Sequence, residues 1–120
     1  MDDRLKAALD FSNYMITLES QKRVLKEQYE NDLLFFYNGG QFTVSQGLIS
    51  FCQSLLQLKQ TETVLVDDNS IPIFVEELEK FTQDVVSNYY KASNKYYTEY
   101  NKLKVNRTVE GIVSWVGAPF

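Results

Sequence analysis

Acidic side chains gather in one region of this sequence, and carboxylates are residues that can do acid–base chemistry. Residues 62–84 hold a single lysine against these carboxylates: Glu62, Asp67, Asp68, Glu76, Glu77, Glu79 and Asp84. Glycoside hydrolysis needs a matched pair of carboxylates, but no spacing here selects one. Several of the glutamates fall where a helix is predicted to begin, and a helix N-terminus favours negative charge. We therefore expect them to stabilise a helix end.

The segment Asp67-Asp68-Asn69-Ser70 has the residue types of a calcium loop. Such a loop needs oxygen ligands at its first, third and fifth positions and a glutamate at its twelfth. Counting from Asp67 puts Ile71 at the fifth position, and counting from Asp68 puts Pro72 there. The pattern fails in both registers, so a tight turn rich in Asp and Asn is predicted.

A second compact segment, Asn38-Gly39-Gly40, could in principle cradle a phosphate. A phosphate-binding loop of the Walker type continues into Lys-Ser/Thr and a helix, and a dinucleotide loop needs a further glycine and a helix. Here β-prone residues follow instead. The sequence predicts a hairpin turn, either a three-residue loop with a bulge at its last glycine or a two-residue Asn-Gly turn with Gly40 in the returning strand.

The chain has no histidine and one cysteine, Cys52. Nucleophilic sites built on Cys-His or Ser-His-Asp are excluded, and so is the commonest nitrogen ligand of zinc. A lone cysteine forms no disulfide within the chain, which is typical of a reducing compartment. Cys52 falls on the apolar face of a predicted helix, which predicts a buried structural thiol. We expect no cofactor, no metal and no enzymatic activity.

Lysines and tyrosines alternate in the last third of the chain. Basic residues beside exposed aromatics can bind single-stranded nucleic acid by phosphate contacts and base stacking. Alternatively, the tyrosines pack against another helix, and the lysines suit the end of their own. The net charge of −4 argues against general nucleic-acid binding. The alternative function, a nucleic-acid or polymerase accessory protein, has these candidate residues: Lys91, Lys95, Tyr97, Tyr100, Lys102 and Lys104.

The elements that carry these residues follow from the apolar spacing. Residues 3–32 repeat apolar side chains at helical steps without glycine or proline, and residues 46–59 do so after a plausible N-cap, Ser45. A long helix of nearly thirty residues is predicted after Val75. Between the helices, LLFFY and QFTVS flank one turn, and TVLVD and IPIFV flank another.

The predicted fold is therefore α+β. Two long antiparallel helices are joined by two β-hairpins, which form a small antiparallel sheet, and a short helix packs on it. Because an isolated hairpin is marginally stable, we expect the two hairpins to share one four-stranded sheet. Residues 1–108 are predicted to form a single domain. Residues 109–120 are predicted to be a C-terminal tail, either a short helix or a partner-binding segment.

Four segments together resemble a family of small proteins of T-even-like tailed phages that infect marine cyanobacteria. The segments are FSNYMITLESQKRVLKEQ, FFYNGGQFTVSQGLISF, VLVDDNSIPIFVEELEKF and YYKASNKYYTEYNKLK. The resemblance covers roughly residues 1–108 and includes no catalytic motif. It implies a viral protein located in the host cytoplasm or in the virion, and it implies no particular activity.

The long helices lead to the function we expect. A thirty-residue helix extends about 45 Å, farther than a compact domain of this size. The simplest way to cover such arms is self-association, so a non-enzymatic, homo-oligomeric assembly protein is predicted, with a possible phage or host protein partner. No apolar run approaches the length of a membrane span. The candidate interface residues are Phe11, Met15, Leu18, Leu25, Tyr29, Tyr89, Tyr96 and Leu103.

Overall fold

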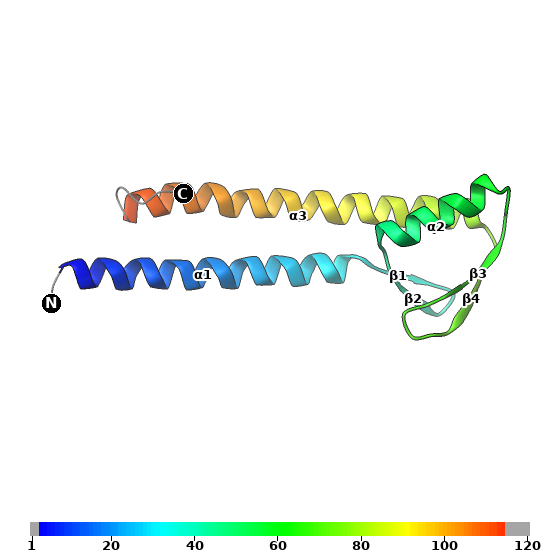
Figure 1. The fold of residues 1–120 in the computed structure, drawn as a ribbon, viewed down its shortest axis with the longest axis horizontal. Helices are drawn as coiled ribbons and strands as arrows, with labels where there is room; N and C mark the ends of the chain where they lie inside the picture. The colour runs from blue at the N-terminus through cyan, green and yellow to red at the C-terminus, as the bar shows by residue number, and fades with distance from the viewer. Residues whose placement is uncertain (1–2, 115–120) are drawn as a thin grey trace. The chain divides into compact units, whose positions relative to one another are not determined.

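The computed structural model describes residues 3–114, with side chains for residues 3–103. The elements are α1 (Asp3–Asp32), β1 (Leu34–Tyr37), β2 (Gly40–Thr43), α2 (Gln46–Gln57), β3 (Thr63–Val66), β4 (Pro72–Val75) and α3 (Leu78–Ser114), coloured along the chain in Figure 1. The expected α+β class, with two long helices, two antiparallel hairpins and one short helix, is confirmed.

The chain divides into two compact units. The helical unit comprises Met1–Gln28 and Lys95–Phe120, and the mixed unit comprises Tyr29–Asn94. Within the helical unit, the segments of α1 and α3 run side by side in opposite directions (Figure 1). That residues 1–108 form a single domain stays a prediction.

Helix α1 begins and ends where the apolar spacing places it. Its last turn closes when Leu33 N–H donates to the Tyr29 carbonyl at 3.1 Å, and β1 begins one residue later. The side-chain amide of Asn88, on α3, donates to the Asp32 carbonyl at 3.1 Å. That bond satisfies one of the carbonyls that every helix leaves unpaired at its C-terminus.

The first hairpin uses the tighter of its two possible turns. Asn38 and Gly39 both have positive φ, 47° and 79°, and Tyr37 pairs with Gly40. This is a two-residue turn of type I′, whose twist matches the strands. Gly40 lies in the strand rather than in a bulge, and its missing Cβ leaves room for Ile73. A Cβ added there would lie 2.6 Å from Ile73 Cγ1.

The second hairpin is formed as expected, and it pairs β3 with β4 so that Val66 lies opposite Pro72. The single four-stranded sheet that we expected is not formed, because β1 and β2 make one two-stranded sheet and β3 and β4 another. Neither hairpin stands alone, however. Asp68 N–H donates to the Gln41 carbonyl at 2.8 Å, and Asn38 Nδ2 donates to the Phe74 carbonyl at 3.2 Å. Aspartate carboxylates make further bonds between the hairpins.

Helix α2 begins at its predicted cap, where Ser45 Oγ accepts from Leu48 N–H at 3.1 Å. The helix lays Cys52 into the core of the mixed unit, where the thiol is fully buried. Burial raises the pKa of Cys52, and a hydrogen bond with Thr82 lowers it by less. The prediction of a buried structural thiol is confirmed.

The core of the mixed unit is built around one aromatic ring of α3. Phe81 is 1 % exposed and meets three rings from the first hairpin edge to face, with centroid distances of 5.6 Å to Phe35, 5.3 Å to Tyr37 and 5.5 Å to Phe42. Such edge-on pairs add to the stabilisation from buried area. Phe81 thus holds the hairpin on the first turns of α3.

Helix α3 continues through Ser114, so residues 109–114 of the predicted tail extend that helix. The rest of the tail, residues 115–120, lies outside the described residues, and so does any role of the tail in binding a partner. Along the part of the chain that the structure describes, no helix combines the length and the apolar character needed to cross a membrane.

Candidate functional site

The Asp67 carboxylate serves as an acceptor for three backbone groups. Its Oδ1 accepts from the N–H of Asn69 at 2.9 Å and of Ile71 at 2.8 Å, and its Oδ2 accepts from Gln41 N–H at 3.0 Å. These bonds, the one from Ile71 first, hold the pKa of Asp67 below its ordinary value, although burial opposes them. The carboxylate therefore closes the turn after β3 and anchors the edge of β2.

Asp68 makes the second anchor between the hairpins. Its carboxylate accepts from the Thr43 hydroxyl at 2.6 Å, from Thr43 N–H at 3.1 Å and from Gln41 Nε2 at 3.2 Å. The Thr43 hydroxyl is the largest cause that lowers the pKa of Asp68, while burial and the neighbouring Asp67 charge act against it. The two aspartates thus accept the β2 N–H groups that a further strand would otherwise pair with. Their oxygens are engaged in hydrogen bonds within the protein.

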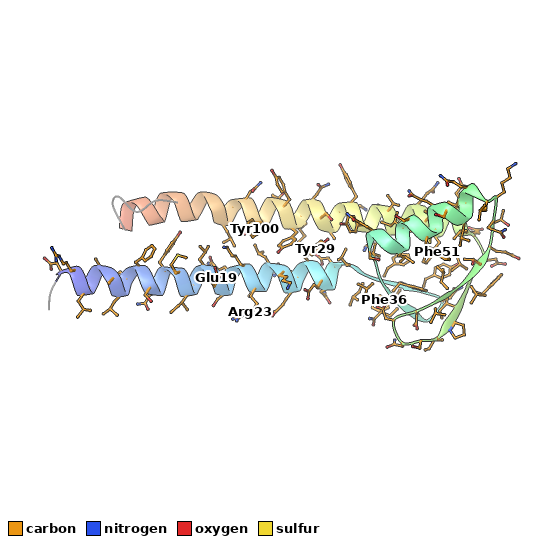
Figure 2. All side chains as sticks on the ribbon, in the orientation of Figure 1. Glu19, Arg23, Tyr29, Phe36, Phe51 and Tyr100 are labelled. Atoms are coloured by element: carbon orange, nitrogen blue, oxygen red, sulfur yellow. The ribbon has the colours of Figure 1, made fainter. Side chains whose placement is uncertain are left out.

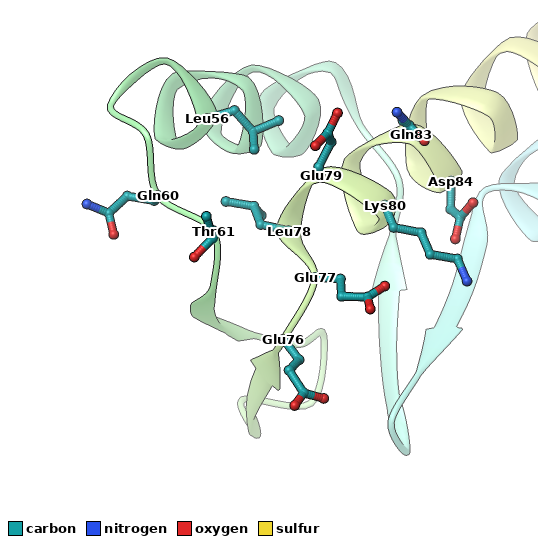
Figure 3. A pocket seen from close by; sticks show the side chains of 10 residues that line it. All are labelled: Leu56, Gln60, Thr61, Glu76, Glu77, Leu78, Glu79, Lys80, Gln83 and Asp84. Carbon is teal, nitrogen blue, oxygen red and sulfur yellow. The ribbon is translucent and has the colours of Figure 1, made fainter.

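All the remaining carboxylates of the acidic region except Glu62 line an open groove of about 680 Å³ in the mixed unit (Figure 3). Apolar side chains, Leu56 and Leu78, lie among them. A pocket that joins several carboxylates to apolar walls is what an enzyme using carboxylates alone would need. Every acidic residue here is exposed, whereas a general acid at neutral pH depends on a buried, desolvated carboxyl group. The groove lining is completed by Gln60, Thr61, Glu76, Glu77, Glu79, Lys80, Gln83 and Asp84.

The groove is lined by more acidic than basic side chains, so its surface is negatively charged. Within the described residues, no group of three acidic or cysteine side chains is arranged to hold a metal ion. The groove floor is fixed by the bond from Leu78 N–H to the Thr61 carbonyl at 3.0 Å. Its carboxylates place negative charge at the point where β4 leads into α3.

The predicted interface residues all lie on the inner sides of the helices. Leu18 is buried, and Leu25 and Leu103 line a groove of about 450 Å³ between α1 and α3 in the helical unit. Phe11 and Met15 are half-buried. The others are tyrosines in intramolecular contacts: Tyr29 and Tyr89 pack on the core of the mixed unit, and Tyr96 meets the Tyr100 ring edge to face at 6.1 Å.

A second apolar stripe on α1 was missed by this prediction. Leu5, Leu9 and Ile16 are exposed, and we call them the outer stripe. Their steps of four and seven residues put them on one side of the helix, about 200° from Leu18. Ile16 is 64 % exposed and Leu18 is 4 % exposed, which fits this geometry. This spacing is visible in the sequence, but the predicted interface was based on the longer apolar stripe through Leu18 and Leu25.

The lysines and tyrosines of the alternative nucleic-acid site do not share one face. In the helical unit, Lys95 and Lys102 are separated by seven residues and lie on one side of α3, about 160° from Tyr97. Tyr97 is exposed, whereas Tyr100 is half-buried (Figure 2). Lys22 lies over the Tyr100 ring, with its Nζ 6.0 Å from the ring centroid.

The lysines of that candidate site do not build one strongly basic surface. Lys102 pairs with Glu99 at 3.1 Å, which neutralises its charge locally. Lys91 is exposed and belongs to the mixed unit. The side chain of Lys104 lies outside the described residues. The arrangement therefore does not bring phosphate contacts and stacking rings together.

Comparison of the chain with protein-family models, with curated proteins and with solved structures gives no match.

Proposed function

We propose that this protein is a non-enzymatic assembly protein that associates with copies of itself through the outer stripe of α1. The observation that carries the proposal is the pair of apolar stripes on one helix. One stripe is covered by α3 within the helical unit, and the other is exposed to solvent. Apolar side chains that repeat along a second side of a helix gain free energy when a partner covers them.

The size of the outer stripe sets the strength of this association. Full burial of a leucine or isoleucine contributes roughly 2 kcal/mol, and the three stripe residues are each about half exposed. A symmetric pair buries six such side chains, which amounts to about 6 kcal/mol before other contacts and costs. Because the loss of translational and rotational freedom on association offsets part of that free energy, the pairing is expected to be weak, with a dissociation constant of tens of micromolar or higher.

The other candidate chemistries support this proposal rather than compete with it. The Cys52 thiol is buried, the Asp67 and Asp68 carboxylates hold the two hairpins together, and the carboxylates of the acidic groove are exposed. These groups have structural or electrostatic roles. The resemblance to phage proteins makes the virion or the host cytoplasm the proposed place of assembly, with a phage or host protein as a further partner.

Energy transfer between labelled copies tests the proposal. Gln28 is exposed on α1, outside the outer stripe, so a Gln28→Cys variant can carry a donor dye in one batch and an acceptor dye in another. The buried thiol of Cys52 stays unlabelled. Mixing the batches at tens of micromolar should give energy transfer, and excess unlabelled protein should abolish it.

A charge placed in the outer stripe identifies the surface. Ile16→Glu in the labelled background should remove the energy transfer, because pairing would bury an unpaired carboxylate. Gln21→Glu adds the same charge to α1 away from the stripe and should leave the transfer intact. Equal transfer in the Ile16→Glu and Gln21→Glu proteins would refute association through this stripe.

A further inference from the structure

The outward face of the second hairpin is apolar throughout. An antiparallel sheet that packs one face on a core normally carries polar residues on the other. Here the residues alternate as expected, with Leu65, Ile73 and Val75 buried, but the exposed positions are apolar as well. Across the strands, Val64 pairs with Phe74 and Val66 with Pro72; we call these four residues the hairpin face. Val64 is 57 % and Val66 64 % exposed.

Strand β3 also has an unpaired edge. It pairs with β4 on one side, and Asp67 N–H continues that ladder by donating to the Ile71 carbonyl at 2.9 Å. Successive backbone N–H groups in a strand point to opposite sides. The N–H groups of Val64 and Val66 therefore point away from β4. Among the described residues, no backbone hydrogen bond from another element reaches them.

The edge lacks the lysines, prolines and bulges that protect many edge strands, although β3 is short, with four residues. Edge strands are usually protected by lysines, prolines or bulges. Residues 63–66 read Thr-Val-Leu-Val, with no charge, no proline and regular pairing to β4. The proline of this hairpin, Pro72, is on the other strand. An unprotected edge beside an apolar face has the features of a surface that accepts an extended peptide.

The charges around β3 indicate which peptide fits. Residues 60–79 contain six carboxylates and no lysine or arginine. Glu62 and Glu76 flank the paired residues Thr63 and Val75. Glu76 also lines the acidic groove (Figure 3). A second copy fits poorly, because antiparallel pairing of β3 with itself would set Glu62 of one copy beside Asp68 of the other. Like charges in that position are destabilising.

We propose that the open edge of β3 binds an extended segment of a partner protein, with alternating apolar side chains and a run of lysines or arginines at one end. The partner's backbone adds as a strand beside Val64 and Val66. Its outward apolar side chains lie beside Val64 and Val66 and extend the hairpin face, and its basic run lies beside Glu62, Glu76 and the acidic groove. This surface belongs to the mixed unit and is separate from the outer stripe of α1.

A labelled peptide tests the proposal on the full chain. The probe is a fluorescein-labelled peptide with a run of lysines followed by alternating valine and threonine, and its binding is followed by anisotropy. Binding should weaken as salt rises, because the charges on both sides are exposed. Hydrogen exchange at the Val64 and Val66 amides should slow in the complex. A matched peptide with glutamates in place of the lysines should not bind.

Two matched variants, each replacing an exposed apolar side chain by lysine, locate the surface. Val64→Lys puts a charge on the hairpin face and should weaken binding by about tenfold or more. Phe36→Lys changes a comparably exposed side chain on β1, 68 % exposed, and should leave binding unchanged (Figure 2).

Several results would overturn the proposal. One is equal binding of the glutamate peptide. Another is equal loss of binding in the Val64→Lys and Phe36→Lys proteins, and a third is binding that leaves the Val64 and Val66 amides unprotected. Absence of binding by the lysine peptide at low salt would exclude it as well. Because the glutamate comparison uses the wild-type chain, it remains decisive even if a variant fails to fold.

Discussion

Replacing Gly40 by alanine should destabilise the mixed unit through one close contact. The new Cβ would lie 2.6 Å from Ile73 Cγ1 and 2.9 Å from its Cδ1, whereas carbon atoms in contact prefer about 3.5–4.0 Å. Ile73 is buried in the core and paired with Leu65, so it has little room to move. Either the first hairpin, β1 and β2, would have to shift by about 1 Å relative to Ile73, or the Ile73 side chain would have to leave its preferred rotamer.

The expected loss follows from two opposing effects. Overpacking a buried position costs about 1–3 kcal/mol. Replacing glycine by alanine also restricts the unfolded chain, which offsets about 0.4–1 kcal/mol. The net free energy of unfolding should fall by about 1–2 kcal/mol, measured by urea denaturation with circular dichroism. The matched control is Gly47→Ala in α2, where the nearest side-chain atom is 3.8 Å away. That change should stabilise the chain by up to about 1 kcal/mol.

A double-mutant cycle separates this contact from a general effect on the strand. Ile73→Ala removes both clashing carbons and should cost about 2–5 kcal/mol alone. Combined with Gly40→Ala, the new methyl group enters the vacated space, so the double variant should lose at least about 1 kcal/mol less than the sum. Strict additivity, or a Gly40→Ala protein as stable as the Gly47→Ala protein, would refute this account of the contact between the hairpins.

Four further predictions follow from the same contacts. Acid should weaken the mixed unit: the pKa values of Asp67 and Asp68 are lowered in the folded chain, so their contribution is complete above the ordinary value of 3.8 and is lost as the pH falls through the folded values. Asp68→Asn should flatten that loss in acid titrations followed by circular dichroism, and an unchanged profile would contradict it. Ser45→Ala should cost about 1 kcal/mol in urea unfolding and Ser45→Asp much less; equal losses would argue against the cap. Iodoacetamide should modify Cys52 only in denaturant, as read by mass spectrometry, and rapid labelling of the native chain would disprove its burial. Labelled single-stranded DNA should show no salt-dependent binding to the lysines and tyrosines of the helical unit, so a shift at low salt that Tyr97→Ala abolishes would restore the nucleic-acid function.

Local signals predicted the elements of this fold well. The ends of α1 follow from an unbroken helical spacing that gives way to β-prone residues at Leu33, and α2 begins at its serine cap. These features depend on neighbours within a few residues. The hairpin turns were found for the same reason, since Asn, Gly, Asp and Ser reach turn conformations at low cost.

Features that depend on distant residues were not predictable. The choice of turn at Asn38-Gly39 is tied to Ile73, which is more than thirty residues away. The two-sheet arrangement depends on Asp67 and Asp68, which accept from β2 in place of a third strand. Side-chain carboxylates that replace a strand leave no periodic signal, because they look like ordinary turn residues.

The candidate interface was predicted on the inner side of the helices for a related reason. Apolar spacing shows that a helix face is covered, but it does not show whether the cover comes from the same chain. The seam through Leu18 and Leu25 belongs to the helical unit itself. Only the exposure of Leu5, Leu9 and Ile16 distinguishes the stripe that is free to meet another copy.

Sedimentation equilibrium of the unlabelled wild-type chain tests the central proposal most directly. A single chain has a mass of 14.0 kDa. The apparent mass should rise above this value as the concentration increases through tens of micromolar, and Ile16→Glu should hold it at the mass of one chain. A wild-type mass that stays at one chain up to several hundred micromolar would contradict self-association through α1.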